Sequence, residues 1–500
     1  MKVEGNELLL WTYNTILNYL EKLNDPLQKI NKNIPIQELS DKLNLTLPRE
    51  VANSGEAYTN FTESMQTFLD YSVLSGHRHF YNQLYGELEV SALAAEFLSI
   101  LNNSSMATYQ MSPVATLMER KIIERFAQMI WSHTPSFSSD SADGLLVLGG
   151  SYANMMAILC ARNYLFPKFK DYGYSSVKNQ LKIFVSEEAH YSFMRAANTL
   201  GIGHKNVVIV ESDHLGKMKI EQLEKNIVKS IEDGDKPFFV AATFGTTVTG
   251  SIDSFQEIYE VANKYGLWFH IDGAFLGPLL LDPSRFFVDE VATALTAVTA
   301  GIEFADSFSL DAHKMMGVPL TCSAILFKRG ETLRESICGG EGDYLFHLHQ
   351  DDHQDDHLNA TDIGKYSLQC GRKIDCLKLW GLWQYLGDEG ILKRFENLFK
   401  LIKYAEEIIK QNSEDLELVL PRQSLILLFR YCRGLDKINK INDINYSIHQ
   451  KIISRGDFMV NYAIWKGKLS LRLVILNQNA SKEDLDNFFH LIMSIGKEVS

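Results

Sequence analysis

Residues 144–166 read GLLVLGGSYANMMAILCARNYLF, which is an apolar run, two glycines and then apolar residues at helical spacing. Further apolar runs follow before residue 330, most of them separated by helical patterns. They are KIFVS (182–186), NVVIV (206–210), FFVAATF (238–244), LWFHID (267–272), DSFSL (306–310) and CSAILF (322–327). Alternation of short apolar runs with helical patterns is typical of βαβ units. The stretch therefore predicts a large α/β domain around a mostly parallel, seven-stranded sheet that is covered on both faces.

The pattern changes on either side of this stretch. Residues 1–105 read as amphipathic helices and predict a helical N-terminal segment or arm. The large domain then covers residues 106–385, and Ser112 with Pro113 predicts an N-cap and a first-turn proline for its first helix. New helical and apolar patterns over residues 386–500 predict a small C-terminal α+β domain.

The composition excludes several classes of function. The 500 residues include 49 Lys and Arg against 62 Asp and Glu, so the formal net charge is −13, opposite in sign to that of a chain that tracks a phosphate backbone. We therefore expect no nucleic-acid partner. No apolar stretch is long and uncharged enough to span a membrane. Glu4 and Glu7 interrupt the start before a signal-like run forms, so we expect a cytoplasmic protein without a membrane partner.

Small and polar residues follow the predicted strands, where ligands bind in such sheets. Gly150 and Ser151 open a helix after the first strand, and such a turn suits a phosphate but also occurs in many turns that bind nothing. His190 follows the strand at 182–186, and a lone histidine is more often structural than catalytic. Thr247 lies in a hydroxyl-rich turn that either binds a ligand or only closes the strand. None of these signals by itself identifies a ligand-binding site.

Charged residues at the ends of two apolar strands need a common explanation. Asp272 ends the run LWFHID, and a buried carboxylate is costly unless it meets a cation or several donors. His313 and Lys314 follow DSFSL, and a buried lysine is costly unless it is neutralised, paired or covalently used. Pyridoxal phosphate fits the whole set. It needs an anion site, a lysine for a Schiff base, an acidic partner for its ring nitrogen and a group that stacks on its ring.

Seven motifs, in this order, resemble a known family. They are GGSYANMMAILCAR (149–162), SEEAHYSFMRAA (186–197), ATFGTTVTGSID (242–253), HIDGAF (270–275), ADSFSLDAHKMMGVP (305–319), CSAILFK (322–328) and QCGRKIDCLKLW (369–380). From about residue 60 onward the chain is similar to the group II pyridoxal-phosphate-dependent amino-acid decarboxylases, most of all to their glutamate and cysteine-sulfinate decarboxylase branch. The resemblance implies a type I fold, as in aspartate aminotransferase, and pyridoxal 5'-phosphate as cofactor.

The resemblance also assigns roles residue by residue. It makes Lys314 the catalytic Schiff-base lysine and Asp272 the partner of the cofactor's ring nitrogen. His190 stacks on the ring and helps to orient the bond that breaks, which makes it catalytic, and Ala274 packs on the other side. The remaining expected cofactor contacts are Gly150, Ser151 and His313 at the phosphate and Thr247 near the ring hydroxyl.

Substrate and partner are implied in the same way. Gln83 matches a position that reaches the substrate side chain, and Arg472 matches an arginine that binds a substrate carboxylate, although an ion pair within the protein would explain this arginine equally well. We expect decarboxylation of an acidic L-amino acid, namely glutamate, aspartate or cysteine sulfinate. A diamino or aromatic substrate is the alternative, and a non-catalytic relative that binds a metal or a partner is a remote one. Family members are homodimers with shared active sites, so we expect a homodimer.

The match breaks in the loop at 345–365. Relatives carry a tyrosine there that helps to protonate Cα, whereas this loop has none and contains HLHQDDHQDDH at 347–357. His353 or His357 is the candidate proton donor, since histidine titrates near neutrality. Without a donor, decarboxylation coupled to oxidative deamination would give an aldehyde in place of the amine. A solvated acidic loop explains the same run most simply, and we assign no metal site because a defined ligand spacing is missing.

Asp311 is a second departure, because many relatives carry asparagine at this position. A carboxylate beside a phosphate repels it unless the carboxylate is turned away or paired. The details of phosphate binding therefore depend on where this side chain points.

Overall fold

The computed structural model describes residues 2–43, 45–50, 53–132, 134, 137–138, 142–286, 298–337, 362–434 and 438–500. The chain forms two compact units. The larger unit comprises Leu88–Phe399 and Arg422–Ser424, and the smaller unit comprises Met1–Glu87, Lys400–Pro421 and Leu425–Ser500. The chain thus changes unit near residues 87 and 399, whereas the sequence pattern changes near 105 and 385, because a helical pattern does not reveal which sheet a helix joins. The division into three domains stays a prediction.

The larger unit is built on a seven-stranded sheet with the order β2-β8-β7-β6-β5-β3-β4. The strands are β2 (Asp143–Val147), β3 (Leu181–Ser186), β4 (Val207–Val210), β5 (Lys236–Thr243), β6 (Trp268–Asp272), β7 (Ser307–Asp311) and β8 (Ser323–Phe327). Strands β4, β3, β5, β6 and β7 run parallel, and β8 runs antiparallel to both of its neighbours. Each of the quoted apolar runs forms one of these strands, so the predicted α/β sheet is confirmed.

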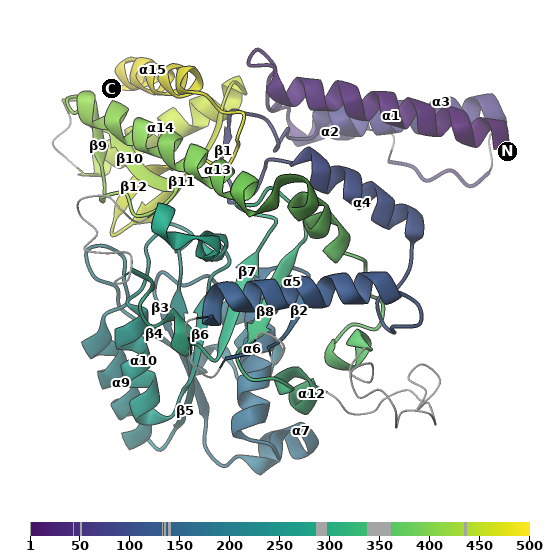
Figure 1. Ribbon diagram of the computed structural model, residues 1–500. Helices are drawn as coiled ribbons and strands as arrows, with labels where there is room; N and C mark the ends of the chain where they lie inside the picture. Colours follow the sequence, from purple (N-terminus) through teal and green to yellow (C-terminus); the bar gives the residue numbers. More distant parts are fainter. Residues whose placement is uncertain are drawn as a thin grey trace. The chain divides into compact units, whose positions relative to one another are not determined.

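The larger unit also contains several helices (Figure 1). They are α4 (Val90–Asn102), α5 (Pro113–Trp131), α6 (Gly150–Leu165), α7 (Phe169–Tyr172), α8 (Ser192–Thr199), α9 (Ile220–Glu232), α10 (Phe255–Tyr265) and α12 (Thr332–Ile337). Helix α6 packs on β5, β7 and β8 and contacts α8 and α12, whereas α9 and α10 pack together on β5, and α5 packs on β2 and β8. The buried residues Leu223, Ile227 and Ser230 of α9 recur every three or four positions, which gives that helix one face for the sheet.

The start of α5 confirms the predicted positions of Ser112 at the N-cap and Pro113 in the first turn, but not a capping hydrogen bond. The helix begins at Pro113 as expected, but the Ser112 hydroxyl makes no capping hydrogen bond. It donates to the Ser105 carbonyl at 3.0 Å and lies 2.8 Å from the Ser104 hydroxyl. The loop before the helix therefore competes successfully for this hydroxyl, and proline suits the first turn because its missing N–H would have no partner there.

The smaller unit contains a five-stranded sheet with the order β1-β11-β12-β10-β9. Its elements are α1 (Lys2–Asn24), α2 (Ile36–Lys42), α3 (Ser54–Tyr71), β1 (Phe80–Tyr81), β9 (Leu416–Leu418), β10 (Ile426–Tyr431), α14 (Ile438–Arg455), β11 (Met459–Trp465), β12 (Lys468–Val474) and α15 (Lys482–Val499). Helix α13 (Cys376–Gln411) runs through both units and is interrupted at Gly387, where φ is 59°. Strand β1 pairs in parallel with β11, so the N-terminal segment contributes a strand to the C-terminal sheet. Within the described ranges, no helix is long and apolar enough to cross a membrane.

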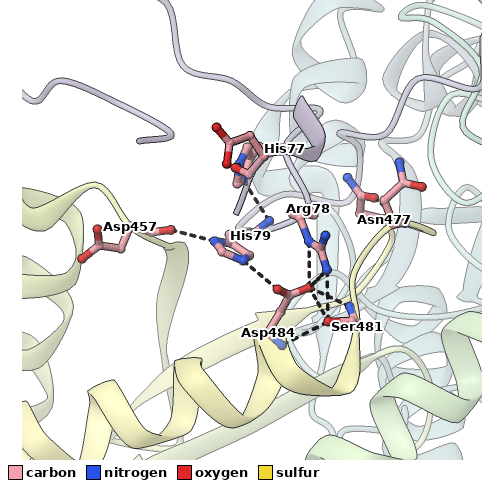
Figure 2. A network of polar contacts seen from close by, with 9 residues as sticks. His77, Arg78, His79, Asp457, Asn477, Ser481 and Asp484 are labelled. Atoms are coloured by element: carbon pink, nitrogen blue, oxygen red, sulfur yellow. Dashed lines mark hydrogen bonds and ion pairs between the residues drawn. The ribbon is translucent and has the colours of Figure 1, made fainter. Parts of the chain in front are cut away.

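A charged network joins the N-terminal segment to the last helix inside the smaller unit (Figure 2). Asp484, in the first turn of α15, accepts hydrogen bonds from Nε and Nη2 of Arg78 at 2.9 and 2.6 Å, and its other oxygen faces His79 Nε2 at 2.9 Å. Ser481 caps the same helix and its hydroxyl accepts from Arg78 at 3.0 Å. These buried contacts fix the segment that leads into β1.

Candidate active site

The carboxyl edge of the seven-stranded sheet gathers most of the predicted site residues. Asp272 is the last residue of β6, His190 follows β3 and Thr247 follows β5. Lys314 follows β7, which is parallel to these strands. Since parallel strands end at the same edge of a sheet, the fold brings these side chains together from segments far apart in the sequence.

Asp272 is buried and supplied with donors. Its Oδ2 accepts from Asn154 Nδ2 at 2.8 Å, and its Oδ1 accepts from the Ser309 hydroxyl at 3.2 Å and the Ala274 N–H at 3.1 Å. The Asn154 carbonyl oxygen faces His270 Nε2 at 3.0 Å, which fixes the amide in turn. The carboxylate is therefore held in one orientation at the strand end.

His190 is half-buried, and the charges of Asp272 and Lys314 influence its pKa. Its Nδ1 accepts from the Ser192 N–H at 3.2 Å. Burial lowers the pKa of His190, and this effect outweighs the opposing influence of Asp272, while Lys314 lowers the pKa further. The ring is therefore neutral at pH 7, with its proton on Nε2, and suits stacking on another ring.

Lys314 meets a carboxylate. Its Nζ lies 3.0 Å from Asp311 Oδ2, and its side chain is 19% exposed. The Ser323 hydroxyl donates to Asp311 Oδ1 at 2.5 Å. Burial by itself would raise the pKa of Asp311, but Lys314, His313 and the Ser323 hydroxyl outweigh burial and hold this pKa below its usual range. The sequence did not show where the Asp311 side chain points. In the structure its carboxylate is ionised and paired with Lys314.

His313 is buried beside this pair. Its Nδ1 lies 2.9 Å from the Cys322 carbonyl oxygen and 3.2 Å from the Cys322 nitrogen, and its Nε2 lies 3.8 Å from Asp311 Oδ2. Burial lowers the pKa of His313, and the nearby Asp311 reverses this only in part. The imidazole of His313 can therefore offer a hydrogen bond to an anion.

The turn before α6 is shaped for close approach. Gly149 has a φ of 122°, which favours glycine. A Cβ on Gly150 would lie 2.9 Å from Asp311 Oδ2 and 3.2 Å from the Ala274 Cβ, so a side chain would not fit there. No side chain caps α6, and Ser151 in its first turn is exposed. The N-terminus of α6 is therefore available to a ligand.

The turn after β5 is crowded in a similar way. A Cβ on Gly245 would lie 2.6 Å from Leu276 Cγ, and the φ of 93° also favours glycine. Thr247 in this turn is half-buried at the carboxyl edge. The tight turn thus sets the position of the threonine.

The two predicted substrate residues belong to the smaller unit. Gln83 is half-buried and follows β1, whereas Arg472 lies in β12 between Leu428 and Asn461 of the neighbouring strands. Arg472 is 5% exposed, and its Nε and Nη2 have no hydrogen-bond partner among the described residues. Burial lowers the pKa of Arg472 to about 10. Nε and Nη2 of Arg472 therefore form no ion pair with the described residues, so the alternative explanation is not observed there.

The loop histidines His353 and His357, with the whole run at 347–357, lie outside the described residues. In the part of the chain that the structure covers, no cluster of three or more His, Cys, Asp or Glu side chains is arranged to hold a metal ion.

Comparison with known proteins decides the family. The model described as pyridoxal-dependent decarboxylase conserved domain matches residues 41–432. The chain belongs to the pyridoxal-dependent decarboxylases. Cysteine sulfinic acid decarboxylase of Mus musculus is 32% identical over 470 residues, which cover 92% of this chain and 90% of that protein. Glutamate decarboxylase of Drosophila melanogaster is 31% identical over 510 residues, covering 99% and 94%. The crystal structure of mouse CSAD has a TM-score of 0.88 and 29% identity, and 99% of each chain is covered.

The residues of this decarboxylase fit the pyridoxal phosphate that its family uses. An uncapped helix N-terminus opened by Gly150 suits the phosphate, the fixed carboxylate of Asp272 suits a protonated ring nitrogen, and the amine of Lys314 is partly exposed. The cofactor and the carboxy-lyase class predicted from the sequence are confirmed by the family.

Asn154 and Ser309, which hold Asp272 in this decarboxylase, were not predicted from the sequence. Asn154 is 1% exposed on α6, and Ser309 is fully buried in β7. The available signal was a polar residue at a position where the surrounding pattern requires an apolar one. Such a residue is hydrogen-bonded when buried, but the sequence does not name its partner.

Proposed function

We propose that this decarboxylase acts on an acidic L-amino acid, namely glutamate, aspartate or cysteine sulfinate. The observation that carries the proposal is the burial of the Arg472 guanidinium without a hydrogen-bond partner for Nε and Nη2 among the described residues. A buried guanidinium with unpaired donors is costly until a ligand meets it, and the two oxygens of a carboxylate or sulfinate match its planar fork. Where Arg472 faces the substrate side chain, a diamino substrate would bring a second cation to it, and an aromatic side chain would leave its donors unpaired. Two relatives that cover most of the chain are named for cysteine sulfinic acid and for glutamate, which supports the same choice.

The remaining roles follow from the site geometry and belong to the same proposal. When bound, pyridoxal phosphate supplies a cationic ring that accepts the electron pair left on Cα as carbon dioxide departs. Lys314 binds the cofactor covalently, and Asp272, held by Asn154, keeps a proton at the ring nitrogen. The neutral ring of His190 stacks on the cofactor opposite Ala274 and excludes water from that face.

The other contacts of the proposal complete the site. Gly150, Ser151 and His313 bind the phosphate, and Thr247 lies at the ring hydroxyl. Gln83 contacts the substrate side chain. His353 or His357 donates the proton to Cα, and this assignment stays a prediction because both lie outside the described residues.

Release of carbon dioxide from a substrate panel tests the function. The purified protein with pyridoxal phosphate is given glutamate, aspartate, cysteine sulfinate, 2,4-diaminobutyrate and an aromatic amino acid. We expect release from the acidic group only, and none from Lys314→Ala. Amine as the product supports a working proton donor, whereas aldehyde and oxygen consumption would show decarboxylation coupled to oxidative deamination. Release from the diamino or aromatic substrate alone would overturn the proposed substrate class.

Arg472 allows a sharper test with a matched control. Arg472→Gln should lower kcat/KM for acidic substrates by about 100-fold, because a desolvated charge pair is lost. Arg430 is also 5% exposed and lies on the neighbouring strand β10, but its Nε and Nη2 bind Glu417 at 2.9 and 2.8 Å. Arg430→Gln should lower stability and leave the preference for acidic substrates intact. Equal loss of selectivity in both variants would contradict the role of Arg472.

We also propose a homodimer in the cytoplasm. Helix α4 buries Ala92 and Ala95, yet on its other positions Leu98 and Leu101 are 60% and 78% exposed. Large apolar side chains exposed in succession along one helix are typical of a protein interface. The sharing of active sites between subunits and the cytoplasmic location rest on the family resemblance and on the sequence.

A further inference from the structure

Asp311 has an unusual position for a carboxylate. It ends β7 and is 2% exposed, and its two oxygens engage Lys314 Nζ at 3.0 Å and the Ser323 hydroxyl at 2.5 Å. The ion pair thus holds the amine that the proposed function assigns to the cofactor.

The same carboxylate lies against the proposed phosphate site. A Cβ on Gly150 would lie 2.9 and 3.0 Å from the two oxygens of Asp311. Gly150 is the first residue of α6, and a helix N-terminus carries a partial positive charge that favours an anion. Asp311 therefore already places a negative charge beside the helix end that the phosphate would use.

We propose that Asp311 limits the affinity of this protein for pyridoxal phosphate, because its carboxylate retains the Lys314 ammonium and adds a negative charge beside the phosphate site. This inference rests on the proposed roles of Lys314 and Gly150. Bond formation takes the Lys314 nitrogen from its ion pair: the nitrogen bonds to the aldehyde carbon, and the aldehyde oxygen leaves as water with two of the ammonium hydrogens. The third hydrogen stays on the nitrogen or passes to solvent. Asp311 then remains buried with the Ser323 hydroxyl but without the Lys314 ammonium, beside the proposed phosphate site at Gly150.

Cofactor titration of the cofactor-free protein tests the proposal without any turnover. Asp311→Asn keeps the shape and removes the charge. We expect it to bind pyridoxal phosphate at least about tenfold more tightly than the wild type, since like charges at close range disfavour binding. A gain of affinity cannot come from damage to the fold, because damage weakens binding.

Asp306→Asn is the matched control. Asp306 precedes the other end of β7, where its carboxylate accepts from the Phe269 N–H at 2.8 Å. This variant should bind the cofactor like the wild type. Equal or weaker binding by Asp311→Asn would overturn the proposal.

A second variant and a further control keep the outcomes separate. If Asp311→Asn does not fold, Asp311→Ser removes the same charge with a smaller side chain and should shift affinity in the same direction. Lys314→Ala should lose the absorbance of the covalently held cofactor. If the wild type itself showed no such absorbance, the proposed function would fail, whereas failure of the Asp311 proposal leaves that absorbance intact.

Discussion

Asn154 shows how much of the site depends on a single amide. Its Nδ2 donates to Asp272 at 2.8 Å and to the Ser192 hydroxyl at 3.0 Å, and its Oδ1 lies 3.1 Å from the Ser309 hydroxyl oxygen. One buried side chain therefore links α6, the first residue of α8, the end of β6 and the middle of β7. Its loss would leave the buried carboxylate of Asp272 short of a donor, which costs about 1 to 3 kcal/mol.

Asn154→Ala should weaken the binding of pyridoxal phosphate by about tenfold and lower the unfolding free energy by about 2 kcal/mol. Cofactor titration and urea unfolding measure the two effects. Asn163→Ala is a matched control, because Asn163 is also buried on α6 but donates to the Ser336 carbonyl at 2.9 Å. The control should lose stability alone, and loss of cofactor affinity in both variants would mean that Asn154 acts only through the fold.

At the scale of elements, the junction between the N-terminal segment and α15 depends on Asp484. Burial would raise the pKa of Asp484, but hydrogen bonds from His79, Arg78 and Ser481 outweigh burial and hold the pKa well below its usual range. A carboxyl group with a lowered folded-state pKa contributes stability that is complete above its unfolded-state pKa of about 4 and is lost as the pH falls further. Acid should therefore weaken this junction.

Asp484→Asn should lower the unfolding free energy at pH 7 by about 3 kcal/mol, because it leaves Arg78 and His79 without the charge they meet. The wild type should also lose more stability than the variant between about pH 5 and pH 3. Urea unfolding across this range measures both. Asp486→Asn on the same helix, where the wild-type carboxylate accepts from Tyr404 at 2.9 Å, is the control. Parallel pH curves for wild type and Asp484→Asn would contradict this account.

At the scale of the whole molecule, the exposed positions of α4 predict assembly. Leu98→Glu with Leu101→Glu places two charges on that surface and should shift the protein from dimer toward monomer by sedimentation analysis. Ile231→Glu, at an apolar position on α9 that is 49% exposed, should leave the mass unchanged. A wild type that sediments as a monomer, or a double variant that stays dimeric, would contradict an interface at α4.

The sequence by itself predicted the sheet, the cofactor and the main residues that bind the cofactor. Apolar runs alternating with helical patterns are local signals for the sheet. The roles of Lys314, Asp272 and Gly150 are implied by the motifs that resemble the decarboxylase family. The structure placed them at one edge, as the parallel strands require.

The tertiary structure alone decided which groups touch. That Asp311 lies against Gly150, that Asn154 holds Asp272, and that Nε and Nη2 of Arg472 find no hydrogen-bond partner among the described residues all depend on segments far apart in the chain. The addition of β1 to the C-terminal sheet is decided in the same way, because a two-residue strand carries almost no local pattern. Hydrogen bonds and ion pairs act over a few ångströms, so their partners are set by the packing of elements and not by local periodicity.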